Sequence, residues 1–201
     1  MDTNSPHPTI EWADGIEKVL KKEGEEAQSL YWLTNRASIV AGKWNDYISV
    51  PCIILQTVTG FLSASSGLVP PLALGAFSVF TGILSTILAY YKFSARAEGH
   101  RVCSQLYLKI YKKIEVELSL PIAQRMNPVK LLEDVRDKLA RISEVAPEIP
   151  EDVIAIYKAQ FKENNTSKPI IANGLDEISI YHEVSMSVPE PTRVRINMVP
   201  Q

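Results

Sequence analysis

The side chains that could do chemistry are few and lie far apart in the 201-residue chain. The three histidines are scattered: one near each end and one, His100, in the middle. His100 follows Glu98 and Gly99, and two ionisable groups this close together could form a proton-transfer site. We favour the alternative, a solvated helix face beside a membrane.

A pair of carboxylates is the other candidate for catalysis. Asp134 and Asp137 lie three residues apart on an expected helix, but Arg136, Lys138 and Arg141 are interleaved with them. This is typical of a solvated charged face. The sequence holds none of the motifs of zinc peptidases, paired-cysteine zinc sites, phosphate-binding loops, dinucleotide folds or serine hydrolases. We therefore expect no enzyme, no cofactor and no metal.

Composition narrows the function classes further. Lys and Arg total 21 against 23 Asp and Glu, which argues against a nucleic-acid partner. Cys52 and Cys103 are too few for a disulfide framework or a cysteine zinc site. The charges are unevenly placed, because the 45 residues from Tyr47 to Tyr91 include no Asp, Glu, Lys, Arg or His. A lipid bilayer is the usual cause of such a run.

The uncharged run, 47–91, is long enough for two membrane spans. A bilayer core about 30 Å thick needs roughly 20 helical residues. A cluster of turn-forming residues, 65–71, divides the run into spans at about 48–66 and 72–91. Pro51 is then expected in the first turn of span one, where its missing N–H costs little. The predicted fold class is all-α: a membrane-anchored helical protein with a two-helix transmembrane hairpin, juxtamembrane helices and an extended C-terminal tail.

The segment before the hairpin, 1–46, is interpreted as an N-terminal arm followed by an amphipathic helix. Residues 1–8 are polar and lack a signal-peptide pattern, so the hairpin is expected to be an internal anchor. The helix should become firm after Gly24. Its apolar positions recur at helical spacing: Ile16, Val19, Leu20, Ala27, Leu30, Tyr31 and Leu33.

The segment 92–161 is expected to be a helical region on the cytosolic side. Pro121 should end its first helix, and Asn127 should cap a second that starts at Pro128. A short third helix is expected near 151–161. The second helix carries the clearest apolar stripe, an expected helix–helix interface: Val129, Leu132, Val135, Leu139 and Ile142. Its nearest partner is the stripe of the first helix, and the antiparallel pair would form a stalk: Val102, Leu106, Ile110 and Ile114.

The last segment, 162–201, is predicted to be an extended tail. It is rich in Asn, Ser and Pro, and helix is not expected in it. Ile178 and Ile180, and later Val194, Ile196 and Met198, alternate with polar residues as in a strand or an extended chain.

Within the run, a buried hairpin in a soluble bundle is the alternative to a membrane anchor. A soluble hairpin would normally show charge on its outer face, and none occurs. Gly60, Gly75 and Gly82 suit close packing of membrane helices, and we expect at least one at a tight contact. Basic residues flank both spans and place both termini on the cytosolic side: Arg36, Lys43, Lys92, Arg96 and Arg101.

Gln56 is the most polar residue of span one. It could line a pore or hydrogen-bond a neighbouring helix, and the second role is the more frequent. The serines and threonines of the run could likewise line a narrow polar pore in an oligomer.

Several short stretches resemble two-span membrane proteins of nucleocytoplasmic large DNA viruses. They are 29–33 (SLYWL), 50–55 (VPCIIL), 57–61 (TVTGF), 146–150 (APEIP) and 173–175 (NGL). The order of parts is similar to that of SLATT domains, two-span modules associated with nucleotide-signalling systems. The resemblance implies pore formation or membrane perturbation for the SLATT group, and it transfers no residue roles from the viral members.

Three functions follow as hypotheses. The first is a structural component of a viral internal membrane that tethers the membrane to capsid or to neighbouring membrane proteins, as an oligomer or within a large assembly. The second is an oligomeric SLATT-like pore. The third is an adaptor of a host membrane without a virion role. In each case the partners are a lipid bilayer and other proteins, with the termini on the cytosolic or capsid-facing side.

Overall fold

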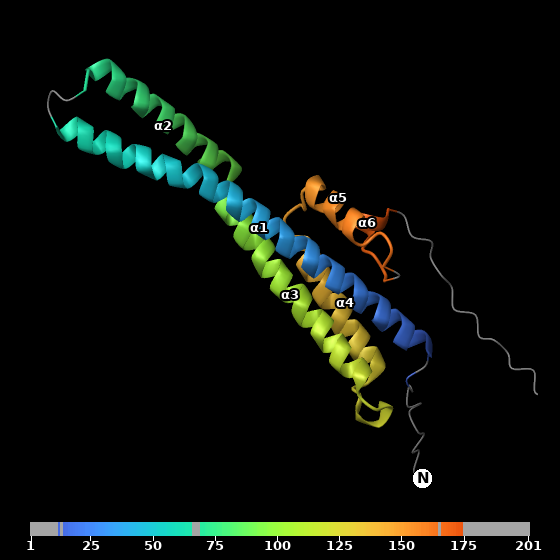
Figure 1. The fold of residues 1–201 in the computed structure, drawn as a ribbon. Helices are drawn as coiled ribbons and strands as arrows, with labels where there is room; N and C mark the ends of the chain where they lie inside the picture. Colours follow the sequence, from blue (N-terminus) through green and yellow to red (C-terminus); the bar gives the residue numbers. More distant parts are fainter. Residues whose placement is uncertain (1–11, 13, 66–68, 165, 175–201) are drawn as a thin grey trace, which may run out of the picture.

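The computed structural model describes residues 12, 14–65, 69–164 and 166–174, and every regular element in them is helical (Figure 1). In chain order these are α1 (Asp14–Ala64), α2 (Pro71–Tyr91), α3 (Phe93–Ser119), the short 3-10 helix η1 (Ile122–Gln124), α4 (Pro128–Val145), α5 (Glu151–Gln160) and α6 (Ile170–Asn173). The all-α class is confirmed for the described part of the chain.

Helix α1 continues without a break from the charged N-terminal region into the uncharged run. Its 51 residues include Pro51, which was expected at the start of a separate helix and instead lies in the interior. That expectation is wrong, because one missing N–H removes a single hydrogen bond from a helix that neighbouring turns still hold. The ribbon of α1 changes direction between its blue and cyan portions (Figure 1), as a proline-containing helix commonly does.

Helices α2 and α3 are joined by one residue. Lys92 has φ 48° and ψ 43°, a left-handed conformation that is uncommon for a residue with a Cβ. Its N–H donates to Leu88 O and its carbonyl accepts from Arg96 N, so hydrogen bonding continues across the joint. Lys92 thus redirects the chain from the hairpin into α3.

A three-helix bundle forms the main core. Buried residues come from α1, α3 and α4: Leu20, Ala27, Cys103, Tyr107, Ile110, Ile114, Leu131, Val135 and Ile142. The most extensive contact is between α1 and α3, and α4 packs against both. We refer to this bundle as the stalk, because the hairpin projects beyond it (Figure 1).

The expected packing of α4 on α3 is confirmed, since α3 is the helix that α4 contacts most. The structure adds that α3 itself packs mainly on α1, so the stalk is a three-helix bundle and not the expected antiparallel pair. The α3 stripe is shifted accordingly, since Val102 is exposed while Cys103 and Tyr107 are buried. On α4, Val135 and Ile142 are buried as expected.

The rest of the expected α4 interface is also shifted. Leu131 lies at its centre, at 0% exposure. Leu132 and Leu139 pack only partly buried against the core, and Val129 is half-buried. The buried face is broader than one stripe because α4 contacts two helices at once.

The start of α4 and the end of α3 lie close to where the sequence predicts them. The Oδ1 atom of Asn127 accepts from Val129 N (3.1 Å) and Lys130 N (3.2 Å), with Pro128 in the first turn, so the expected cap of α4 is confirmed. Helix α3 ends at Ser119, and Leu120 is extended before Pro121, as the residue before a proline tends to be.

A second, smaller core joins α5 and α6 to α1. It contains Leu33, Ala37, Ile149, Val153, Tyr157 and Ala172. The Tyr157 hydroxyl donates to Ser29 Oγ at 2.8 Å, a buried contact that fixes α5 on α1. Helix α6 corrects the expectation that helix is absent from 162–201: Pro169 lies at its N-cap position and Ala172 is buried. The strand-like positions at 178–180 and 194–198 lie outside the described residues.

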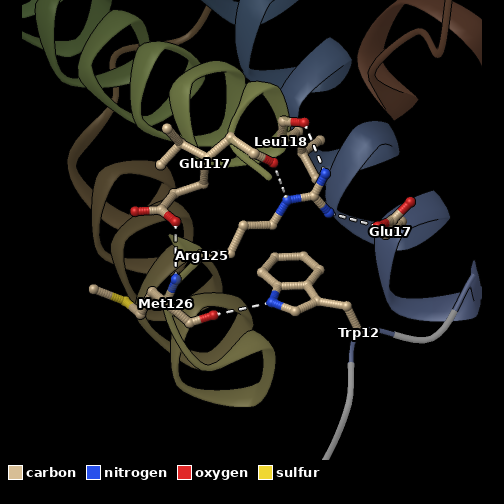
Figure 2. Close-up of polar contacts among 7 residues, drawn as sticks. Trp12, Glu17, Glu117, Leu118, Arg125 and Met126 are labelled. Atoms are coloured by element: carbon tan, nitrogen blue, oxygen red, sulfur yellow. Dashed lines mark hydrogen bonds and ion pairs between the residues drawn. The ribbon is translucent and has the colours of Figure 1, made fainter. Parts of the chain in front are cut away.

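The far end of the stalk is held by Arg125 (Figure 2). Its guanidinium donates to Leu118 O at the end of α3 and pairs with Glu17 of α1 at 2.5 Å. It also lies over the ring of Trp12, 4.9 Å from the centroid, and Trp12 Nε1 donates to Met126 O at 3.2 Å. A cation at the C-terminal end of a helix is favourable, so Arg125 stabilises α3 while it joins three segments.

Candidate membrane hairpin

The hairpin formed by α2 and the second half of α1 exposes its apolar side chains. Leu72 is 87% exposed, Phe61 69% and Val79 65%. Both α1 and the continuous α2–α3 segment contain a window long and apolar enough to cross a membrane, and only 6% of each window is buried. A hairpin buried in a soluble bundle, the alternative considered above, is therefore wrong for a single copy of the chain.

A small polar cluster joins the two helices near the base of the hairpin. The Sγ atom of Cys52, a buried residue, lies 3.3 Å from Ser85 Oγ, and Gln56 Nε2 donates to the same hydroxyl at 3.1 Å. Gln56 Nε2 also donates to Cys52 Sγ at 3.6 Å. Gln56 thus makes a hydrogen bond between helices, the more frequent of the two roles considered for it. Hydrogen bonds of this kind contribute about 0.6 kcal/mol each in membrane proteins.

The hairpin glycines do not pack closely within the chain. A Cβ added at Gly60, Gly75 or Gly82 would meet no atom within 4 Å, so the expected tight contact is wrong within one copy. The contacts between the two hairpin helices are instead made by larger side chains near the base, such as those of Cys52 and Gln56 with Ser85. The close approaches occur in the stalk, where a Cβ on Gly24 would lie 3.2 Å from Ile114 Cγ2, and one on Gly99 would lie 2.9 Å from Pro147 Cγ.

Beyond the polar cluster, a groove runs between the two helices. Its lining holds only uncharged polar residues and glycine: Gln56, Thr59, Gly60, Ser63, Ser78, Thr81, Gly82 and Ser85. Six of these belong to a repeated motif that the sequence analysis missed, TGFLS at 59–63 and TGILS at 81–85. Because the helices are antiparallel, the two copies give the hairpin an inverted repeat. Thr81 and Ser63 donate to carbonyls of their own helices, which lowers the cost of a polar face among apolar residues.

The base of the hairpin carries aromatic and then basic side chains. Ser38 Oγ donates to Ala97 O, and Cys52 contacts Ser85. Since α1 runs antiparallel to the α2–α3 segment between these two contacts, Lys43 lies at about the same level as Lys92. The aromatic residues lie on the hairpin side of both lysines. These aromatic residues are Trp44, Tyr47, Tyr90 and Tyr91, all exposed. This order, apolar then aromatic then basic, is typical of a membrane–water interface.

The other expected juxtamembrane cations lie on the stalk. Arg36 and Arg96 are exposed. Arg101 is also exposed, but its guanidinium forms two hydrogen bonds with the Glu98 carboxylate, at 2.7 and 2.8 Å. This hydrogen bonding lowers the pKa of Glu98.

The segment Glu98–His100 is only partly the solvated face that was expected. Glu98 is exposed, but His100 is 2% exposed and its Nδ1 has no hydrogen-bond partner among the described residues. Burial, with a smaller contribution from the positive charge of Arg96, lowers the pKa of His100. The linker after α4 covers this turn, because Pro147 lies directly over Gly99. His100 is thus kept neutral at physiological pH.

Metal-ligand chemistry finds no support in the part of the chain that the structure describes, where no three His, Cys, Asp or Glu residues gather at one place. Asp134, one of the two carboxylates considered above, accepts from Lys113 at 2.8 Å and from Lys138 at 2.7 Å. Hydrogen bonds from these lysines lower its pKa and keep it ionised. Comparison of the chain with family models, with curated proteins and with solved structures finds no match.

Proposed function

We propose that the protein is a two-pass membrane protein, anchored by the hairpin of residues 47–91, whose stalk holds partner proteins at a fixed distance from the bilayer. The exposed apolar surface of the hairpin carries this proposal. Apolar side chains such as Leu72, Phe61 and Val79 would form a large aggregation-prone patch in water. Lipid would cover them without any further protein.

The arrangement of charge supports one topology. The uncharged hairpin ends at the aromatic residues of its base, and basic residues follow on the stalk side. By the positive-inside rule the stalk and both termini lie on the cytosolic side, and the turn between α1 and α2 lies on the other. With the resemblance to viral two-span proteins, the function we favour is a non-enzymatic tether between a viral internal membrane and capsid or neighbouring membrane proteins.

Labelling of single introduced cysteines in sealed vesicles tests the anchor. A membrane-impermeant maleimide should reach Glu144→Cys on the stalk and Pro70→Cys at the hairpin turn from opposite faces, since both native residues are exposed. The unmodified chain is the control, because Cys52 and Cys103 are buried. Labelling of both introduced cysteines from one face would show that the hairpin does not cross the bilayer.

The polar groove favours a second candidate function, an oligomeric pore. Its lining of serine, threonine, glutamine and glycine would be better placed against water or another copy than against lipid. Reconstituted bilayers separate the two functions. A pore should conduct ions, and Ser78→Val should reduce the conductance several-fold, whereas Ser119→Val outside the hairpin should not. A tether should show no conductance above that of protein-free bilayers.

A further inference from the structure

A second groove lies between α3 and α4, on the stalk. Its floor is apolar and its rim is basic, and it is lined by Leu106, Lys109, Ile110 and Lys113 of α3 and by Lys138, Arg141 and Ile142 of α4. Antiparallel packing continues this surface toward the hairpin, where Val102 and Val145 are 44% and 70% exposed. An apolar strip bordered by cations is unusual on a surface exposed only to water.

The charges around this groove are not balanced. Lys113 and Lys138 share a single carboxylate, that of Asp134. Lys109 and Arg141 have no ion pair with any residue in the described part of the chain. Among the described residues, the four cations of the groove thus form ion pairs with one carboxylate, and the groove would favour a segment that combines apolar side chains with further carboxylates.

One segment outside the described residues has this composition. Residues 175–184, with the sequence LDEISIYHEV, contain three carboxylates, five apolar or aromatic residues and no Lys or Arg. The other undescribed terminal stretches differ from it. The N-terminal 1–11 is rich in Pro and polar residues, and 185–201 carries Arg193 and Arg195.

Chain length places the groove within reach of this segment. Ile142 lines the groove, and Ile149, farther along the same chain, lies in one core cluster with Ala172. The stretch from Ile142 to Ile149 spans at most about 25 Å. The described chain ends at Gly174, close to Ala172, and ten further residues can extend roughly 33 Å.

We propose that residues 175–184 dock into the groove between α3 and α4 of the same chain. The apolar side chains of the segment would cover Leu106, Ile110 and Ile142, and its carboxylates would pair with Lys109 and Arg141. A partner protein that carries an acidic amphipathic segment would then have to displace the tail. The stalk surface proposed above for partner binding would thus be covered in the free protein.

Zero-length carbodiimide crosslinking of the full chain in lipid nanodiscs tests this proposal, with the linked peptides identified by mass spectrometry. Crosslinks should join Asp176, Glu177 or Glu183 to Lys109, Lys113 or Lys138. The ion pairs of Asp134 with Lys113 and Lys138 provide an internal positive control. If these control links form and no link joins 175–184 to the groove, the proposal is wrong.

A charge variant of the groove tests whether Arg141 attracts the tail. Arg141 does not react with carbodiimide, so Arg141→Gln removes attraction without removing a crosslinking site; we expect it to lower the tail–groove links at least threefold. Lys158→Gln, an exposed change on α5, should leave them unchanged.

In a mixture of isotopically labelled and unlabelled chains, links within one chain support the proposal, whereas links only between chains would overturn it in favour of docking between two copies. The topology experiment on the hairpin is unaffected by either result.

Discussion

The two halves of α1 bury opposite kinds of side chain. In the stalk half, Leu20, Leu33 and Ala37 are each 0% exposed and charged residues lie on the outside. In the hairpin half, Ile53 is 60% exposed, and the inward face is built from polar groups such as Gln56. One continuous helix thus turns its apolar side chains toward the protein in the stalk and away from the protein in the hairpin. The stalk part is thus built for water, and the exposed apolar face of the hairpin part agrees with the lipid anchor proposed above.

Truncation of one leucine in each region should give the largest contrast. Leu131→Ala removes a side chain that is 0% exposed in the stalk core, and we expect it to lower the free energy of unfolding by about 2–5 kcal/mol. Leu72→Ala, at a residue 87% exposed on the hairpin, should change it by less than about 0.5 kcal/mol. Thermal unfolding followed by circular dichroism in detergent measures both. Equal losses would mean that the hairpin has a protein core of its own.

Glycine substitutions should differ in sign between the two regions. Gly99→Ala places a Cβ 2.9 Å from Pro147 Cγ, and a proline ring cannot swing aside, so we expect a loss of about 1–3 kcal/mol. Gly82→Ala meets no atom within 4 Å and should stabilise its helix by up to about 1 kcal/mol. The same unfolding assay applies. A loss at Gly82 in lipid, but not in dilute detergent, would reveal that this face of the hairpin contacts a second copy in the membrane.

Mild acid should affect the stalk and not the hairpin, which has no Asp, Glu, Lys, Arg or His. The pKa of His100 is lower in the folded protein than in the unfolded chain, because burial disfavours its charged form. The unfolded chain therefore binds more protons below the ordinary value of about 6.5. The contribution of neutral His100 to the free energy of unfolding is fully present above that pH, and it is lost as the pH falls through the pKa of the folded state.

Because one proton is involved, the free energy of unfolding cannot change by more than about 1.4 kcal/mol per pH unit. Unfolding measured at pH 7.5, 6.5 and 5.5 tests the effect, and His100→Asn should flatten the profile in this range. A profile that is unchanged by the substitution would show that His100 is not the group responsible.

Local signals predicted most of the helical elements. Pro121 and the Asn127–Pro128 pair fixed helix ends, and the uncharged run gave the hairpin, because these depend on neighbouring residues alone. The pairing of α3 with α4 was predicted, but the larger contact of α3 with α1 was missed, because the apolar periodicity of α3 does not tell one partner helix from another. The burial of His100 and the close approach at Gly99 also depend on a distant segment, the linker at Pro147, and no local pattern reports it.

The candidate site was less predictable than the fold. Gln56 was singled out by polarity alone, and the structure adds its partners Ser85 and Cys52. The matching TGFLS and TGILS motifs were visible in the sequence, but their meeting across one groove requires the antiparallel hairpin. The open space at Gly60 and Gly82 was not predicted, because it depends on the distance between two helices and not on the residues next to each glycine.

The unbroken course of α1 has a mechanical consequence. A helix of 51 residues is about 77 Å long and is stiff along its axis, because each turn is bonded to the next. Its first turn is clamped by Arg125 at the far end of the stalk, while its last turn reaches the tip of the hairpin. A force applied at Arg125 would therefore be transmitted along α1 toward the hairpin. The helix would bend most easily at Pro51, where one backbone hydrogen bond is missing, so the hairpin would tilt relative to the stalk.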